Sequence, residues 1–185
     1  MTDFGKMFEA LTGYEPLRWQ WRLYEEWLAG DVKPVIDLPT GMGKTNVMAI
    51  WLMARAARRQ IDPLRLPTRL VYVVDRRTVV DQATMLAEKI RAGAERMNKE
   101  TDIAVPTIST LRGQFADNRD WVRDLSRPAI IIGTVDMIGS RLLFSGYRSS
   151  YKQRPLHAGL LGQDSLLILD EAHLSEPFAK IGARY

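Results

Sequence analysis

Cysteine is absent from this 185-residue chain, and histidine occurs only at His157 and His173. The missing cysteine excludes disulfides and thiolate-ligated metals, and two histidines are too few for a multi-histidine metal centre. Any bound metal is therefore expected to be a hard ion with oxygen ligands.

Long apolar runs are missing as well. No stretch of about 18 apolar residues is present to cross a membrane, and no apolar segment of a secretory signal follows the first basic residue, Lys6. A cytoplasmic location without membrane contact is therefore expected. The net charge of +4 is carried largely by arginine and fits a polyanionic partner, although so small an excess is also typical of a solvated surface.

Two kinds of apolar pattern alternate along the chain. Helical spacing predicts helices, and β-branched apolar runs predict strands. The expected helices cover residues 4–11, 17–28, 78–97, 121–125 and 135–144, with one more from near Lys44 to the Asp62-Pro63 break. The expected strands cover residues 34–38, 70–74, 103–108, 129–132 and 165–170. Strands separated by helices predict one α/β domain with a mostly parallel sheet and helices on both faces.

A glycine-rich stretch, "DLPTGMGKT" at residues 37–45, joins one expected strand to one expected helix. The usual phosphate-loop pattern is Gly, four residues and Gly-Lys-Ser/Thr; its end fits here, but Leu38 occupies the first glycine position. In this interpretation Lys44 reaches the β- and γ-phosphates and the Thr45 hydroxyl binds Mg²⁺. The backbone expected to surround the phosphates is that of Thr40, Gly41, Met42 and Gly43. The alternative is an ordinary strand-to-helix turn.

Two acids, Asp170 and Glu171, follow the apolar run at residues 166–169. Such a pair places one carboxylate on the Mg²⁺ shell and the other beside the attacking water. Asp170 is therefore the expected metal-side residue and Glu171 the expected catalytic base, with Lys44 as the third catalytic group. The acids could instead cap a following helix, but Ser175-Glu-Pro-Phe178 already offers a cap. Loop and acids together predict a nucleoside triphosphatase.

Asp170-Glu-Ala-His173 and Leu38-Pro-Thr-Gly-Met-Gly-Lys-Thr45 resemble motifs II and I of the superfamily 2 helicases, in the DExH group. The resemblance implies a RecA-like P-loop NTPase domain over residues 1–185, with Q-motif helices in 1–33 and the core through motif II in 34–185. Tyr14-Glu-Pro-Leu-Arg-Trp-Gln20 looks like the Q motif, whose glutamine reads the adenine edge. Gln20 thus implies ATP, with Mg²⁺, as the cofactor, although it could equally be a polar residue on an amphipathic helix. In the same family His173 would couple the ATP site to a second motor domain.

Within that superfamily the chain is similar to the helicase-nuclease of type I CRISPR systems, and to its subtype I-G form, formerly I-U. The similarity covers nearly the whole chain and rests on residues 36–45, 73–77, 133–137, 154–161 and 170–174. It implies antiviral defence, with single-stranded DNA and a CRISPR targeting (Cascade-type) complex as partners. A superfamily 2 motor of a restriction or repair system is the alternative.

The candidate contacts to the DNA backbone are Arg76, Arg77, Thr134, Arg148 and Lys152. The resemblance places the first three on the DNA track, where they would bond phosphate oxygens without reading bases. The last two lie in Tyr147–Arg154, where interleaved aromatics and cations could stack on and clamp a single strand. The alternatives are solvated arginines at the start of a helix and a basic surface loop.

The family's second motor domain, with its arginine fingers, and its nuclease domain are not recognisable in the sequence. No His-Asp dipeptide marks an HD-type nuclease centre. These domains are expected in cis or in trans. Because arginine fingers contribute about 10³ to 10⁵ in rate, this chain alone is expected to hydrolyse ATP slowly and not to unwind DNA. The alternative is a non-catalytic module that binds ATP, DNA or the targeting complex.

The resemblance also implies an incomplete sheet. In the family, a strand after motif II lies between the strand leading to the phosphate loop and the strand carrying motif II. Without it, two strand edges would be buried and unpaired, at a cost that folds avoid. We therefore expect that the chain belongs to a longer protein, or that something fills or avoids the gap.

Overall fold

A computed structural model of the chain describes residues 4–32, 35–58, 66–111, 120–146, 150–175 and 178. The chain divides into two compact units: residues 1–66 with 86–106, and residues 67–85 with 107–185. The division falls inside helix α4 (Arg77–Met97), which gives its first half to one unit and its second half to the other. The single domain expected over residues 1–185 stays a prediction.

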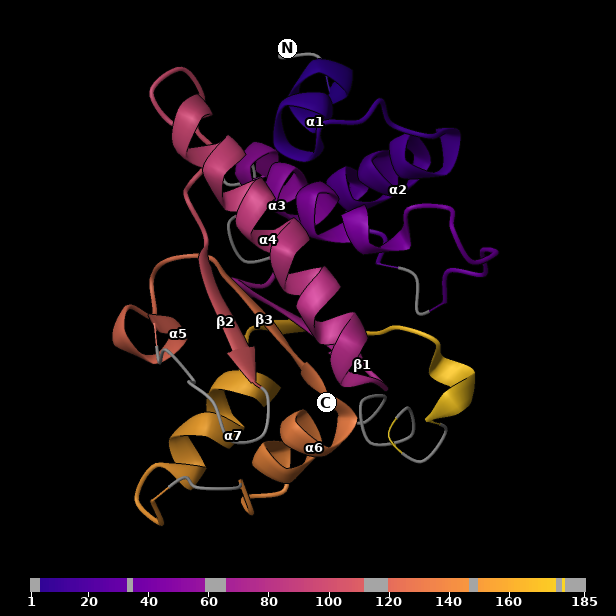
Figure 1. The fold of residues 1–185 in the computed structure, drawn as a ribbon. Helices are drawn as coiled ribbons and strands as arrows, with labels where there is room; N and C mark the ends of the chain where they lie inside the picture. The colour runs from indigo at the N-terminus through magenta and orange to yellow at the C-terminus, as the bar shows by residue number, and fades with distance from the viewer. Residues whose placement is uncertain are drawn as a thin grey trace. The chain divides into compact units, whose positions relative to one another are not determined.

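The first unit is helical in its described residues. Besides the second half of α4, its elements are α1 (Phe4–Thr12), α2 (Arg18–Ala29), the 3₁₀ helix η1 (Lys44–Asn46) and α3 (Val47–Arg58) (Figure 1). The Phe4 ring of α1 stacks on Tyr24 of α2, with 4.4 Å between ring centroids. Helix α3 is apolar and buried on nearly all sides, as expected for the central helix of a small core.

The end of α2 is tied to the end of α3 by one buried cation. Arg58 is 3% exposed, and its Nη1 donates to the backbone carbonyls of Trp27 and Leu28. These carbonyls belong to the last turn of α2, where the helix itself supplies few donors; the Trp27 carbonyl also accepts the Gly30 N–H at 3.1 Å. The contact fixes α2 against the helix that follows the phosphate loop.

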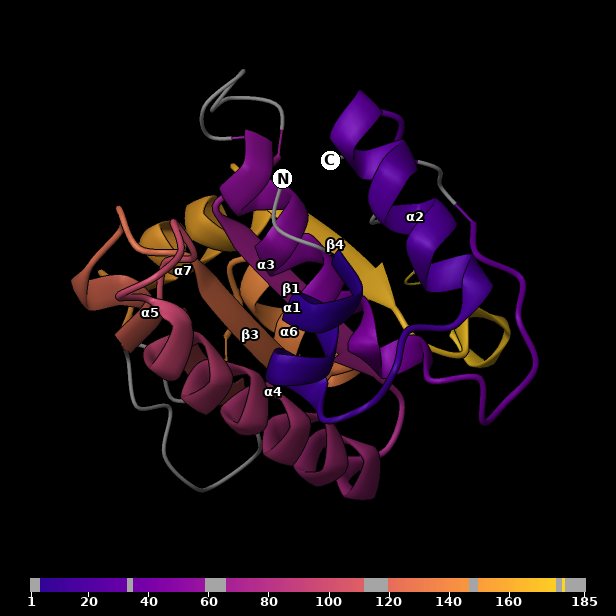
Figure 2. The same cartoon turned by 90° about the horizontal axis from the view of Figure 1, so that it is seen from above.

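The second unit contains the sheet. Besides the first half of α4, its elements are β1 (Arg69–Val74), β2 (Thr107–Leu111), α5 (Asp120–Arg123), β3 (Ala129–Thr134), α6 (Val135–Leu142), α7 (Arg154–Gly162), β4 (Ser165–Leu169) and the 3₁₀ helix η2 (Ala172–Leu174). The strand order is β2-β3-β1-β4 and every pairing is parallel, with β1 between β3 and β4 (Figure 2). The α/β fold with a parallel sheet is thereby confirmed.

Helices lie on both faces of this sheet. On one face, Val71, Val73 and Ile131 join the side chains of α6 and α7 in a single apolar core; the two helices lie side by side (Figure 1). On the other face the Thr84 hydroxyl of α4 lies 3.1 Å from the Thr110 hydroxyl of β2. No helix in the described part of the chain is long and apolar enough to cross a membrane.

One predicted strand begins later in the structure than expected, and the α-helix α7 was not predicted. Strand β2 begins at Thr107 and not at residue 103, because Pro106 has no N–H to donate to a ladder. Helix α7 was not predicted because its sequence contains Pro155 and Gly159, two residue types that usually interrupt helices. Proline is compatible with the first helical turn, where the N–H would be unpaired anyway.

The strand predicted at residues 34–38 is wrong for its described part, residues 35–38. Val35 is 74% exposed and Ile36 40% exposed, and neither belongs to a strand. In the described sheet β4 pairs only with β1, and its residues are half-buried. Because residues 35–38 form no strand, they present no unpaired strand edge. What covers the other edge of β4 stays a prediction.

Candidate functional site

The glycine loop before α3 has the backbone of an anion-binding turn. Gly41 has φ 86° and Gly43 has φ 66°, both in the left-handed region that favours glycine. Gly43 precedes η1, which leads directly into α3. A Cβ at Gly41 would meet no atom within 4 Å, so the space beside the turn is open. Successive peptides of this kind can direct their N–H groups at one anion.

Two side chains of helix α2 donate hydrogen bonds to backbone carbonyls of this loop. Trp19 Nε1 donates to the Met42 carbonyl at 3.0 Å, and Gln20 Nε2 donates to the Gly43 carbonyl at 3.2 Å. The Gln20 amide oxygen accepts from the Leu17 N–H at 2.8 Å, and the residue is only 1% exposed. Both ends of the Gln20 amide are thus bonded within the protein, and its contact with adenine stays a prediction.

Lys44 and Thr45 open η1 and are half-buried. An ammonium and a hydroxyl that directly follow the glycine turn are the donors that a polyphosphate requires. The structure therefore brings Gln20, the loop backbone, Lys44 and Thr45 together in the first unit, as the sequence predicts.

The acids lie in the second unit, immediately after β4. The Asp170 N–H bonds the Val73 carbonyl at 2.9 Å, extending the β1–β4 ladder by one residue. Tyr72 of β1 donates its hydroxyl to Asp170 Oδ2 at 2.9 Å, and the Glu171 N–H bonds Asp170 Oδ1 at 3.1 Å. Both oxygens of the Asp170 carboxylate are thus oriented by hydrogen bonds.

Glu171 occupies a strained backbone position. Its φ of 50° and ψ of 50° are left-handed, a conformation that costs a residue with a side chain on the order of 1–3 kcal/mol. It stands at the N-cap of η2 but makes no side-chain capping bond, so the capping alternative is not realised. Its Oε2 lies 3.5 Å from His173 Nδ1, and the imidazole is 69% exposed.

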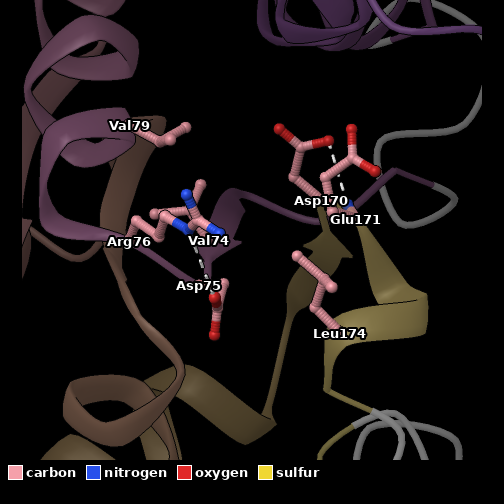
Figure 3. Close-up of a pocket in the computed structure, with 7 residues that line it drawn as sticks. All are labelled: Val74, Asp75, Arg76, Val79, Asp170, Glu171 and Leu174. Carbon is pink, nitrogen blue, oxygen red and sulfur yellow. Dashed lines mark hydrogen bonds and ion pairs between the residues drawn. The ribbon is translucent and has the colours of Figure 1, made fainter.

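A hollow of about 200 Å³ opens beside these acids, at the carboxyl ends of β1 and β4. It is lined by Val74, Asp75, Arg76, Val79, Asp170, Glu171 and Leu174. Figure 3 shows the carboxylates of Asp170 and Glu171 on the same side of the strand end, with Leu174 on the other. Arg76 Nε lies 3.9 Å from Asp75 Oδ2 on the side of the hollow that faces the acids (Figure 3). Ligands of open parallel sheets bind at such strand ends.

The candidate nucleic-acid residues are dispersed over the second unit. Arg76 and Arg77 are exposed where α4 begins, at the same sheet edge as the acids. Thr134 is 8% exposed, and its hydroxyl caps α6 by accepting the Met137 N–H at 3.4 Å. Lys152 is exposed before α7. Arg148 lies outside the described residues, and contact of these side chains with DNA stays a prediction.

The other histidine, His157, belongs to the core. His157 is 4% exposed, and its ring centroid lies 5.2 Å from that of Trp121, which is fully buried. His157 is therefore a packed, structural histidine.

The sequence did not predict two contacts, that of Trp19 with the Met42 carbonyl and that of Tyr72 with the Asp170 carboxylate. Trp19 directly precedes the motif glutamine, but helical spacing alone does not say which side chain meets the loop. Tyr72 is the one aromatic residue in the apolar run of β1, and a polar tip in a buried strand is the signal that could have identified it.

A parallel α/β sheet, a glycine phosphate loop with Lys-Thr, and Asp-Glu-Ala-His after a strand define an ATP-binding motor domain of the superfamily 2, helicase-like class. The family model described as Type III restriction enzyme, res subunit, matches residues 13–180, and the chain belongs to this family. Comparison with curated proteins and with solved structures yields no significant match. The match supports the helicase-like class of the domain, and the narrower CRISPR assignment remains a proposal.

Proposed function

We propose that this domain binds ATP with Mg²⁺ and that hydrolysis drives movement along single-stranded DNA. The observation that carries the proposal is the phosphate loop, whose two left-handed glycines, open side and adjacent Lys44 fit a polyphosphate. The family supports a motor role because its members are helicase-like.

The proposed role of each site residue follows from the chemistry of its side chain. In the first unit Lys44 neutralises the β- and γ-phosphates and Thr45 offers a hydroxyl to Mg²⁺. In the second unit Asp170 is the metal-side carboxylate and Glu171 the base that activates water. Hard oxygen donors of this kind suit Mg²⁺, which keeps several waters and phosphate oxygens as its other ligands. His173, next to Glu171, is the coupling residue.

Lys44→Ala is expected to weaken ATP binding by about 10- to 150-fold, since a charge-assisted hydrogen bond contributes about 1.5–3 kcal/mol. Isothermal titration with ATP and Mg²⁺ measures the change. Lys99→Ala, an exposed lysine of the same unit, is the matched control and should bind like the wild type. Equal affinity of wild type and Lys44→Ala would contradict the assignment of the loop.

Steady-state ATP hydrolysis with and without single-stranded DNA separates an enzyme from a binding module. Turnover that DNA stimulates and Lys44→Ala abolishes would contradict a binding-only role. Turnover no higher than background would contradict the enzymatic role for this chain. ATP binding without turnover would leave the domain as a nucleotide-dependent module.

Tyr72→Phe is expected to raise the Mg²⁺ concentration needed for ATP hydrolysis by about 10-fold, because residues that orient a metal ligand typically contribute 10- to 100-fold to affinity or activity. The variant keeps the buried ring and removes only the hydroxyl bonded to Asp170. Tyr151→Phe, at an 84% exposed position of the same unit, is the control. An unchanged Mg²⁺ requirement in Tyr72→Phe would show that the hydrogen bond does not serve metal binding.

The finer proposal is a role in CRISPR interference, with a Cascade-type targeting complex as partner and the remaining helicase and nuclease domains in cis or in trans. The family match favours a second candidate, the motor of a restriction system. Neighbouring genes discriminate between them. Components of a CRISPR targeting complex would support the first, and a DNA-modification subunit the second.

A further inference from the structure

Two consecutive residues of α2 bond two consecutive carbonyls of the phosphate loop. Trp19 donates to Met42 at 3.0 Å and Gln20 donates to Gly43 at 3.2 Å, each across 23 residues of sequence. From this pairing we propose that Trp19 is a positioning residue, which holds the loop in the form that accepts phosphate. The inference rests on the proposed function, since it concerns the same nucleotide site.

The direction of a carbonyl determines the direction of the next N–H. A trans peptide is planar, and its C=O and N–H point to opposite sides. When the Met42 carbonyl turns toward the indole of Trp19, the Gly43 N–H must therefore turn away from α2. In the same way, the bond from Gln20 to the Gly43 carbonyl turns the Lys44 N–H away from α2. Two consecutive N–H groups are thus directed to the side opposite the helix.

Glycine makes this restraint necessary. Gly41 and Gly43 flank the Met42 peptide units, and glycine populates positive and negative φ about equally, so these peptides can rotate at little cost. The open space beside Gly41 also leaves room for such rotation. A donor from a packed helix restricts the rotation before ligand binds, which lowers the entropic cost of binding.

Trp19 is the informative member of the pair. The Gly43 carbonyl also accepts the Asn46 N–H at 3.1 Å, so loss of Gln20 would leave it a partner. Gln20 in addition caps the start of α2 through Leu17, and its replacement would disturb the helix. Among the described residues, Trp19 is the donor to the Met42 carbonyl, and Trp19→Phe removes this N–H while keeping an aromatic ring.

The test is the affinity of the whole chain for ATP and for inorganic tripolyphosphate, by isothermal titration with Mg²⁺. Because one hydrogen bond contributes about 0.5–1.5 kcal/mol, Trp19→Phe should weaken both ligands by the same factor, about 2- to 12-fold. Trp21→Phe, two residues along α2 and 38% exposed, is the matched control and should change neither affinity. A melting temperature like that of the wild type would show that the fold is intact.

The possible results are distinct. A Trp19→Phe variant that binds tripolyphosphate as the wild type does overturns the inference and leaves the proposed function standing. Weaker binding of ATP alone also overturns it, because that pattern indicates contact with the base. Failure of the wild-type chain to bind either ligand overturns the proposed function itself, and this inference with it. Equal weakening of both ligands supports positioning of the phosphate loop.

Discussion

Glu171→Gln is expected to lower ATP turnover by about 10² to 10⁴-fold while ATP affinity stays within about twofold of the wild-type value. Glutamine preserves the size of the side chain but cannot accept the proton of the attacking water. The strained backbone at this residue supports a functional role, since left-handed non-glycine residues concentrate at functional sites. Single-turnover hydrolysis and isothermal titration, on the same preparation, measure the two quantities.

Glu25→Gln makes the same chemical change on the exposed surface of α2 and should leave both quantities unaltered. If Glu171→Gln hydrolyses ATP at the wild-type rate, another group serves as the base. If affinity and turnover fall together, Glu171 acts in binding, and the division of roles between Asp170 and Glu171 must be revised.

Trp121→Ala is expected to lower the free energy of unfolding by about 3–5 kcal/mol, the usual cost of a large core cavity. Trp121 is fully buried in the apolar core beneath the sheet of the second unit and contacts His157. Urea unfolding followed by far-ultraviolet circular dichroism measures the loss, because tryptophan fluorescence changes with the substitution itself.

Tyr151→Ala removes an aromatic ring of the same unit that is 84% exposed. Its ring centroid lies 5.9 Å from the Arg154 guanidinium, and an exposed cation–π contact contributes about 0.5–1 kcal/mol. The loss should therefore not exceed about 1 kcal/mol. Similar losses for both variants would contradict the assignment of Trp121 to the core.

Strands β1 and β3 could be predicted because strands covered on both faces are apolar throughout, and half-buried β4 carries the same apolar pattern. The same signal failed at residues 35–38, where Val35 and Ile36 are apolar yet exposed. An apolar run indicates that a segment can form a strand, but it does not say whether a neighbouring strand is there to pair with it. Pairing is a property of the sheet and not of the segment.

The conformation of the loop was predictable, whereas the contacts that support it were not. Glycines, Lys44 and Thr45 are adjacent in sequence, so the turn and its donors follow from local conformation. Trp19 and Tyr72 act on partners 23 and 98 residues away. No spacing rule connects residues so far apart, and only the packing of α2 on the loop, and of β1 beside β4, brings their polar tips to the site.

The sequence by itself determined the class of the protein, the parallel α/β fold and the places of the two motifs, because glycine turns, apolar strands and acidic strand ends are set by neighbouring residues. The tertiary structure decided the strand order, the position of β4 at the edge of the described sheet, the burial of Gln20 and the bonds that orient Met42 and Asp170. These features depend on contacts between residues far apart in the sequence, and such contacts form only when the whole chain packs.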